Sequence, residues 1–172
     1  MNDYLQALVF EFLQEQIDDE PIQARPDPFW SALKASGTEI WLDTGDMEEA
    51  SKIWTAEMTA LTTNNTLLNM EIQKGIYDDF IVRAKKVVGS LPPHEQVQEI
   101  SFMLNARHGL RLVKRFGGFV SVELHTDTAY DIEAIVAYGK RFHQIQPEKF
   151  IIKVPYTAEG LLGARKLGEA GI

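Results

Sequence analysis

Apolar side chains at helical spacing open the chain. Residues 3–17 place leucine, valine and phenylalanine every three or four positions, which predicts an amphipathic helix. Residues 22–27 contain a proline and predict a linker. A second, short helix is expected between Asp27 and Gly37, because Asp followed by Pro is a good helix start and Gly a good stop. We therefore interpret residues 1–37 as a helical leader.

From residue 38 onwards, short apolar runs alternate with amphipathic patterns. The runs that predict strands are residues 39–42, 60–63, 119–124 and 150–154. The predicted helices are residues 47–58, 67–88 (interrupted at Gly75), 94–116 (interrupted at His108-Gly109), 127–143 and 157–169. Strands and helices that alternate in this way predict parallel strands joined by right-handed crossovers, and hence an α/β fold.

Composition and charge restrict the function classes. A chain of 172 residues with 45% hydrophobic residues can bury the core of one domain. The net charge of −8 argues against nucleic acid as a partner. The absence of cysteine excludes disulfides, a thiolate nucleophile and cysteine-ligated metals. No apolar run reaches the ~20 residues of a membrane span and the amino terminus lacks a signal peptide's basic start, so we expect a cytoplasmic protein without a membrane partner.

Each predicted strand ends at an ionisable or amide side chain: Asp43, Asn64, Glu123 or Lys153. The carboxyl ends of parallel strands meet at one end of a sheet, where α/β proteins place their chemistry. Lys153 lies among apolar residues, and desolvation would lower its pKa from about 10.4, as an amine that forms a Schiff base requires. Glu123 and Asp43 would then exchange protons with the reacting oxygens, and Asn64 would orient a substrate hydroxyl.

Each of these side chains also has an ordinary structural interpretation. Lys153 could extend between helices on the outer face of its strand, and Asp43 could be a turn residue. Glu123 could be an edge charge facing solvent, and Asn64 could simply start a helix. His125, two residues beyond Glu123, is the one histidine near the proposed site. The coincidence of four polar strand ends favours a site.

The segments around these strand ends resemble transaldolase signatures, in the same order and at plausible spacing. They are residues 41–46, 61–64, 120–123 and 151–155, and the resemblance covers about residues 40–172. It implies a class I, Schiff-base aldolase-type (β/α)₈ barrel that moves a dihydroxyacetone unit between sugar phosphates in the pentose phosphate pathway. It implies no metal and no cofactor, because the imine itself is the electron sink.

Carried over residue by residue, the resemblance assigns five roles. Lys153 matches the Schiff-base lysine, and Glu123 matches the acid/base glutamate that acts through a water molecule. Asp43 matches the aspartate that handles the hydroxyl proton during carbon–carbon cleavage. Asn64 matches the asparagine that binds the substrate, and Thr63, beside it as in the family pattern, is expected to bind the substrate as well.

Two departures from the family pattern border the proposed site. The family usually has Pro where this chain has Asn65, and an Asp and an Arg where it has His125 and Asp127. Since the second pair borders Glu123, substrate preference or activity could differ from the family's.

The chain is also short for this fold. A (β/α)₈ barrel takes about 250 residues, and residues 38–172 supply only four βα units. The family's later-strand arginines, which hold the substrate phosphate, are absent. We therefore expect the amino-terminal half of a barrel, completed by further chain or by oligomerisation, because open sheet edges and an apolar inner face are a liability.

Two rival functions follow from the same residues. One is a sugar-phosphate aldolase that releases dihydroxyacetone instead of transferring it. The other is a non-catalytic half-barrel that serves as a binding or assembly module. The length of 172 residues favours the module, whereas the presence of Lys153, Glu123, Asp43 and Asn64 favours an enzyme.

Overall fold

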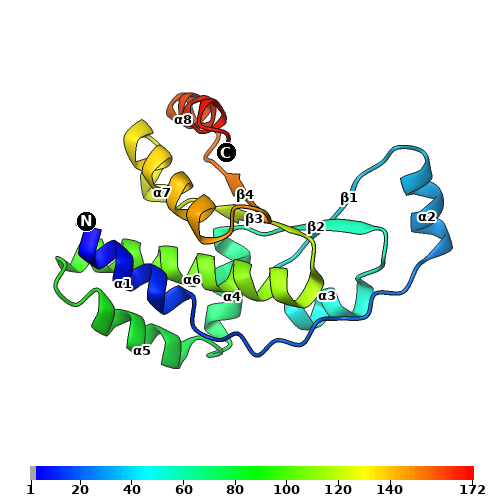
Figure 1. Ribbon diagram of the computed structural model, residues 1–172, viewed down its shortest axis with the longest axis horizontal. Coiled ribbons are helices and arrows are strands. Elements are labelled where there is room, and N and C mark those ends of the chain that lie inside the picture. Colours follow the sequence, from blue (N-terminus) through cyan, green and yellow to red (C-terminus); the bar gives the residue numbers. More distant parts are fainter. Residues whose placement is uncertain (1–2) are drawn as a thin grey trace.

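The computed structural model describes residues 3–172 and folds them around one parallel β-sheet (Figure 1). The strands lie in chain order, and they are β1 (Ile40–Asp43), β2 (Met58–Thr62), β3 (Phe119–Glu123) and β4 (Phe150–Lys153). All neighbouring strands are parallel. The predicted α/β fold is confirmed, and each strand boundary lies within two residues of the predicted one.

Helices connect the strands and follow the last one. In chain order they are α3 (Met47–Ile53), α4 (Asn65–Gln73), α5 (Asp78–Val87), α6 (Pro93–Phe116), the 3₁₀ turn η1 (Thr126–Thr128), α7 (Ile132–Ile145) and α8 (Ala158–Glu169). Asp46 caps α3 by accepting hydrogen bonds from the N–H groups of Glu48 and Glu49, and Thr157 caps α8. The interruption predicted at Gly75 is also confirmed, since this residue lies between α4 and α5 with a φ of 77°.

The interruption predicted at His108-Gly109 is wrong, because α6 runs unbroken from Pro93 to Phe116. Gly109 lies where α6 crosses the sheet. A Cβ atom at this position would lie 2.8 Å from Val122 Cγ1 and 2.8 Å from Phe150 Cζ, which is inside van der Waals contact. The glycine therefore allows helix and sheet to approach closely.

The two faces of the sheet have different surroundings. Successive residues of a strand point to opposite faces, and Val120 and Val122 are fully buried beneath the helices. The other face, which we call the inner face, exposes 47% of Trp41 and 44% of Phe119, with Ile151 beside them. Within residues 3–172, β1 and β4 each pair with a strand on one side only. The inner face and both outer edges are therefore open.

The leader forms two separate helices. Helix α1 (Asp3–Leu13) lies along α6 and α5 (Figure 1). It buries side chains of the apolar face that the helical pattern predicted. They are Leu5, Val9, Phe12 and Leu13. Helix α2 (Pro28–Ala35) lies at the opposite end of the molecule from α1 and has no buried residue.

Arginine side chains of α6 bind the chain between α1 and α2. Arg107 donates hydrogen bonds of 2.7 and 2.6 Å to the carbonyls of Glu15 and Gln16. Arg111 forms an ion pair of 2.8 Å with Asp19. The predicted linker, residues 22–27, follows these contacts, and its Ile22 N–H donates a hydrogen bond of 2.8 Å to the Arg115 carbonyl of α6.

Candidate active site

The polar strand ends project from one face of the sheet. Glu123 and Lys153 are register partners across β3 and β4, and Asp43 is aligned with Thr62 of β2, which is aligned with Ser121 of β3. Register partners of a parallel sheet point to the same side, and Ser121 and Glu123 are two residues apart. The three ionisable side chains therefore all leave the sheet on the inner face, opposite the helices.

Lys153 lies between the end of β2 and the carboxylate of Glu123. Its ammonium group donates a hydrogen bond of 3.1 Å to the Thr63 carbonyl, and Nζ is 4.0 Å from Glu123 Oε1. The exposed fractions of the two side chains are 36% and 24%. This geometry leaves the amine accessible and places a proton donor or acceptor within reach of any group that the amine attacks.

Asn64 and Thr63 contribute to the site in different ways. The side-chain oxygen of Asn64 accepts a hydrogen bond of 2.9 Å from the Leu67 N–H and so caps α4. The helix-start interpretation of Asn64 is thus observed, and its amide NH₂ group binds no other residue of the described chain. Thr63 is buried and acts through its carbonyl, which orients Lys153.

Asp43 stands apart from the Lys153 and Glu123 pair. It lies at the end of β1, with two strands between it and β4, and its side chain is exposed. Within residues 3–172 it forms no hydrogen bond or ion pair. The turn that follows is held by Thr44, whose hydroxyl accepts from the Asp46 N–H at 3.1 Å. The turn interpretation therefore does not explain Asp43, whose carboxylate stays available to a ligand.

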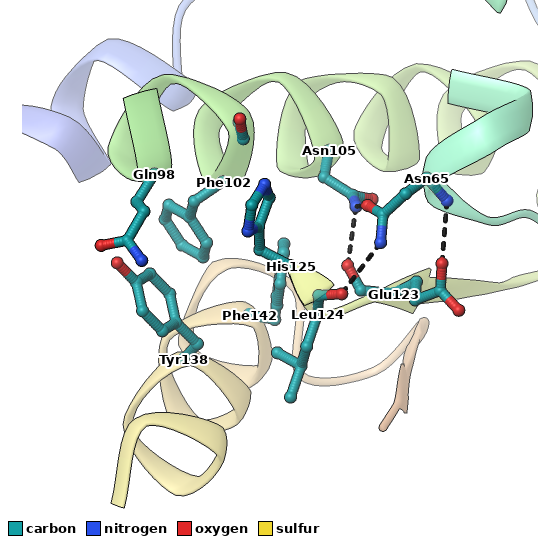
Figure 2. Close-up of a pocket in the computed structure, with 10 residues that line it drawn as sticks. Asn65, Gln98, Phe102, Asn105, Glu123, Leu124, His125, Tyr138 and Phe142 are labelled. Atoms are coloured by element: carbon teal, nitrogen blue, oxygen red, sulfur yellow. Dashed lines mark hydrogen bonds between the residues drawn. The ribbon is translucent and has the colours of Figure 1, made fainter. Parts of the chain in front are cut away.

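Two residues beside Glu123 escaped the sequence analysis as site residues. The Asn65 N–H donates to Glu123 Oε2 at 2.8 Å, and the Asn65 side chain donates to the Leu124 carbonyl at 3.0 Å (Figure 2). Asn105 of α6, which is buried, donates to the Glu123 carbonyl at 2.7 Å. A polar residue on the buried side of α6, among Met103, Leu104 and Ala106, was the available signal for Asn105.

A small cavity lies behind Glu123, between β3, α6 and α7 (Figure 2). Its volume of about 10 Å³ has room for about one water molecule. His125 lines this cavity and accepts a hydrogen bond of 3.2 Å from the Asp127 N–H, through which it caps η1. The two residues that depart from the family pattern here thus bind each other.

The imidazole of His108 is fully buried behind the site. Its Nδ1 atom and the Tyr77 hydroxyl share a hydrogen bond of 2.8 Å. Burial, aided by the positive charge of Arg111, lowers the pKa of His108 to about 4, while the Gly45 carbonyl and Asp19 oppose this shift. His108 is therefore neutral at pH 7 and joins α6 to α5 as a structural polar group.

Residues 3–172 contain no group of three or more His, Cys, Asp or Glu side chains that could hold a metal ion. None of the helices in this part of the chain combines the length and the apolar character that a membrane crossing needs.

The part of the chain that forms the sheet and its helices is similar to known proteins. Residues 40–172 match the family described as Transaldolase/Fructose-6-phosphate aldolase. Proteins named transaldolase from Acidobacterium capsulatum and Trichormus variabilis are 30% and 29% identical over 146 residues, and one from Xanthomonas campestris pv. campestris is 28% identical over 139 residues. These alignments cover 78%, 78% and 76% of this chain but only 43%, 43% and 42% of the relatives. The chain spans less than half the length of the curated relatives it matches.

The family match and the fold agree in extent. The match begins at Ile40, the first residue of β1, and covers all four βα units. Four parallel strands in chain order, with their helices on one face, correspond to half of a (β/α)₈ barrel, as the sequence predicted. The chain belongs to the transaldolase/fructose-6-phosphate aldolase family.

Proposed function

We propose that this chain provides the Schiff-base half of a transaldolase, which moves a dihydroxyacetone unit from a ketose phosphate to an aldose phosphate. The observation that carries the proposal is the pairing of Lys153 and Glu123 at the carboxyl ends of adjacent parallel strands, with 4.0 Å between amine and carboxylate. The transferase activity is in line with the names of the relatives, and we further propose that the reaction belongs to the pentose phosphate pathway of the cytoplasm.

In the first half of the proposed reaction, the amine of Lys153 attacks the ketose carbonyl and forms a carbinolamine. Glu123 delivers a proton through a water molecule to the hydroxyl group, which leaves as water, and the imine forms. The Thr63 carbonyl, 3.1 Å from Nζ, directs the amine during the attack. The gap of 4.0 Å between Nζ and Glu123 Oε1 suits a substrate oxygen or a bridging water molecule.

In the second half, the carboxylate of Asp43 takes the proton of the substrate hydroxyl next to the bond that breaks. The electron pair of that carbon–carbon bond moves into the imine and leaves an enamine, so an aldehyde departs. The enamine then adds to the acceptor aldehyde, and water hydrolyses the new imine to restore Lys153. Asn64 supports both steps by donating a hydrogen bond from its free amide NH₂ group to a substrate hydroxyl.

We further propose that the active protein contains four more βα units, supplied by a longer chain, by a second polypeptide or by a second copy of this chain. The open edges of β1 and β4 and the exposed side chains of Trp41 and Phe119 support this part of the proposal. The relatives, of which this chain covers less than half, have the length for such an extension.

The first prediction is a covalent adduct on Lys153. Borohydride reduction in the presence of fructose 6-phosphate is expected to add the mass of a reduced dihydroxyacetone unit to the peptide that contains Lys153. The aldehyde leaves in the proposed cleavage, and borohydride reduces the imine that remains to a stable amine. The experiment uses the 172-residue chain alone and the same chain mixed with a segment that carries the remaining strands of a relative.

The matched control is Lys153→Ala, which is expected to trap nothing. An adduct of equal yield in this variant would remove the nucleophile assignment. The rival aldolase reaction is separated by its product, since an aldolase releases free dihydroxyacetone without an acceptor. A chain that traps no adduct in either preparation would favour the non-catalytic module.

A further inference from the structure

We infer that Asn65 is a positioning residue, which holds the carboxylate of Glu123 in the orientation that faces Lys153. The inference rests on the proposed function of Glu123 as the acid/base group. It concerns a residue at which this chain departs from the pattern of its family, which usually has Pro there.

Asn65 binds the end of β3 through both its backbone and its side chain (Figure 2). Its N–H donates to Glu123 Oε2 at 2.8 Å, and its Nδ2 donates to the Leu124 carbonyl at 3.0 Å. Asn105 supports it from α6, since Nδ2 of Asn105 is 3.4 Å from Asn65 Oδ1 and 2.7 Å from the Glu123 carbonyl. The two asparagines therefore bind both the carboxylate of Glu123 and the backbone at the end of β3.

The two carboxylate oxygens of Glu123 have different neighbours. Oε2 is occupied by the Asn65 N–H, and Oε1 is the oxygen that faces Lys153 Nζ at 4.0 Å. A hydrogen bond to an ionised carboxylate is among the stronger ones in proteins, and it restricts rotation of the side chain. Without it, a side chain that is one-quarter exposed could turn towards solvent.

The donor is available because of where Asn65 stands in α4. Asn65 is the first residue of the helix, and its N–H has no acceptor inside the helix. The same end of a helix favours a negative charge. A backbone donor that would otherwise bind water is thus directed at Glu123.

Proline at position 65 tests the inference, because it removes the hydrogen bonds that Asn65 donates and leaves the start of α4 unchanged. Proline is well tolerated at the first position of a helix. Asn64, the preceding residue, has φ −151° and ψ 172°, an extended conformation that a following proline accepts. Asn65→Pro therefore removes the N–H and the side-chain amide while α4 keeps its start.

The first readout does not depend on activity. In the NMR spectrum of the 172-residue chain, the Asn65 amide proton is expected at lower field than in Glu123→Gln, because a carboxylate oxygen is a stronger hydrogen-bond acceptor than an amide oxygen. An Asn65 amide proton that behaves alike in both proteins would overturn the inference.

The second readout is the rate of borohydride trapping on Lys153. Asn65→Pro is expected to slow trapping about 10- to 100-fold, the effect of losing a hydrogen bond to a charged group or of a small displacement at a reacting centre. Asn65→Ala retains the N–H and should lose less. Ala158→Pro, which puts proline at the same position of α8, is the control for a proline at a helix start. Equal trapping rates in Asn65→Pro and the unaltered chain would also overturn the inference.

The two readouts separate the inference from the proposed function. If the unaltered chain traps no adduct, the proposed function fails, and the position of the Asn65 amide resonance still decides whether Asn65 holds Glu123. If the unaltered chain traps an adduct but Asn65→Pro traps it equally fast, the proposed function survives and the role of Asn65 is lost. Equal circular dichroism and unfolding midpoints in the variants exclude a loss of folding.

Discussion

The distance between Lys153 and Glu123 has a chemical meaning at the scale of single residues. At 4.0 Å the two groups are too far apart for a direct hydrogen bond, and Nζ instead donates to the Thr63 carbonyl. The lysine is thereby oriented by a neutral group while the carboxylate remains close enough to exchange a proton.

How far these residues could be predicted from the sequence depends on the chemical group through which each one acts. Lys153 and Glu123 are the last residues of apolar strands, and this position was enough to put them at one end of the sheet, because the carboxyl ends of parallel strands meet there. Asn65 binds Glu123 through a backbone N–H, which every residue except proline carries, so only its departure from the family's proline pointed to it. Asn105 reaches the site only because α6 packs on β3, a contact set by tertiary structure.

His108 gives the protein a weakness in acid. Its pKa is about 4 in the folded chain and about 6.5 when unfolded, so the unfolded state binds the proton more tightly. Stability that is present above pH 6.5 is lost as the pH falls towards 4, by about 3 kcal/mol when the loss is complete. Urea unfolding at pH 7 and at pH 4.5 should show this loss.

The comparison variant for this effect is His108→Gln, which retains a side chain capable of hydrogen bonding to Tyr77 but cannot be protonated. The difference in unfolding free energy between pH 7 and pH 4.5 is expected to be smaller in His108→Gln than in the unaltered chain. Equal differences in the two proteins would show that other groups cause the acid sensitivity.

At the scale of elements, α6 is the helix that packs against both the sheet and the other helices of the amino-terminal part. It contacts β3, α5, α4 and α1, and its unbroken run of 24 residues contradicts the interruption that glycine suggested. Local propensity disfavours glycine inside a helix, but here the missing side chain makes room for Val122 and Phe150. Likewise, Asn64 and not Thr66 caps α4, a choice that propensity could not make because both residue types are good caps.

Substitution of Gly109 tests this interpretation. Gly109→Ala is expected to lower the free energy of unfolding by about 1–3 kcal/mol, because the added Cβ would lie 2.8 Å from Val122 Cγ1. Gly168→Ala in α8 is the matched control. Nothing lies within 4 Å of a Cβ there, so the better helix propensity of alanine should raise the free energy of unfolding by about 0.5–1 kcal/mol. Urea denaturation that gives both variants the same sign would contradict the assigned contact.

At the scale of the whole molecule, the sheet has one covered and one open face. The helices bury the side that carries Val120 and Val122, whereas Trp41 and Phe119 remain about half exposed on the inner face. Exposed apolar side chains at neighbouring strand positions form a continuous surface, which in a single domain marks a place of association. The sequence predicted this surface from the number of strands, since four are too few to close a barrel.

This surface is expected to bind an apolar dye when the 172-residue chain is studied alone. Light scattering should show species heavier than the 19.5 kDa monomer. Trp41→Lys should reduce both dye fluorescence and scattering, because a charge on the inner face opposes association. Tyr130→Lys, at an exposed position of 80% outside that face, should change neither. A monomer that folds cooperatively and binds no dye would show that the inner face is not an association surface.

The contacts between the leader and α6 determine an order of events during synthesis. Arg107 and Arg111 bind Glu15 and Asp19, and each pair is separated by 92 positions along the chain. At about 5–20 residues per second, a ribosome needs about 5 to 20 s to make the intervening chain. Throughout this time α6 is missing, and α5, the other helix that α1 packs on, can cover at most part of the apolar stripe of α1. The nascent chain therefore presents its first helix to chaperones and proteases until α6 has left the ribosome.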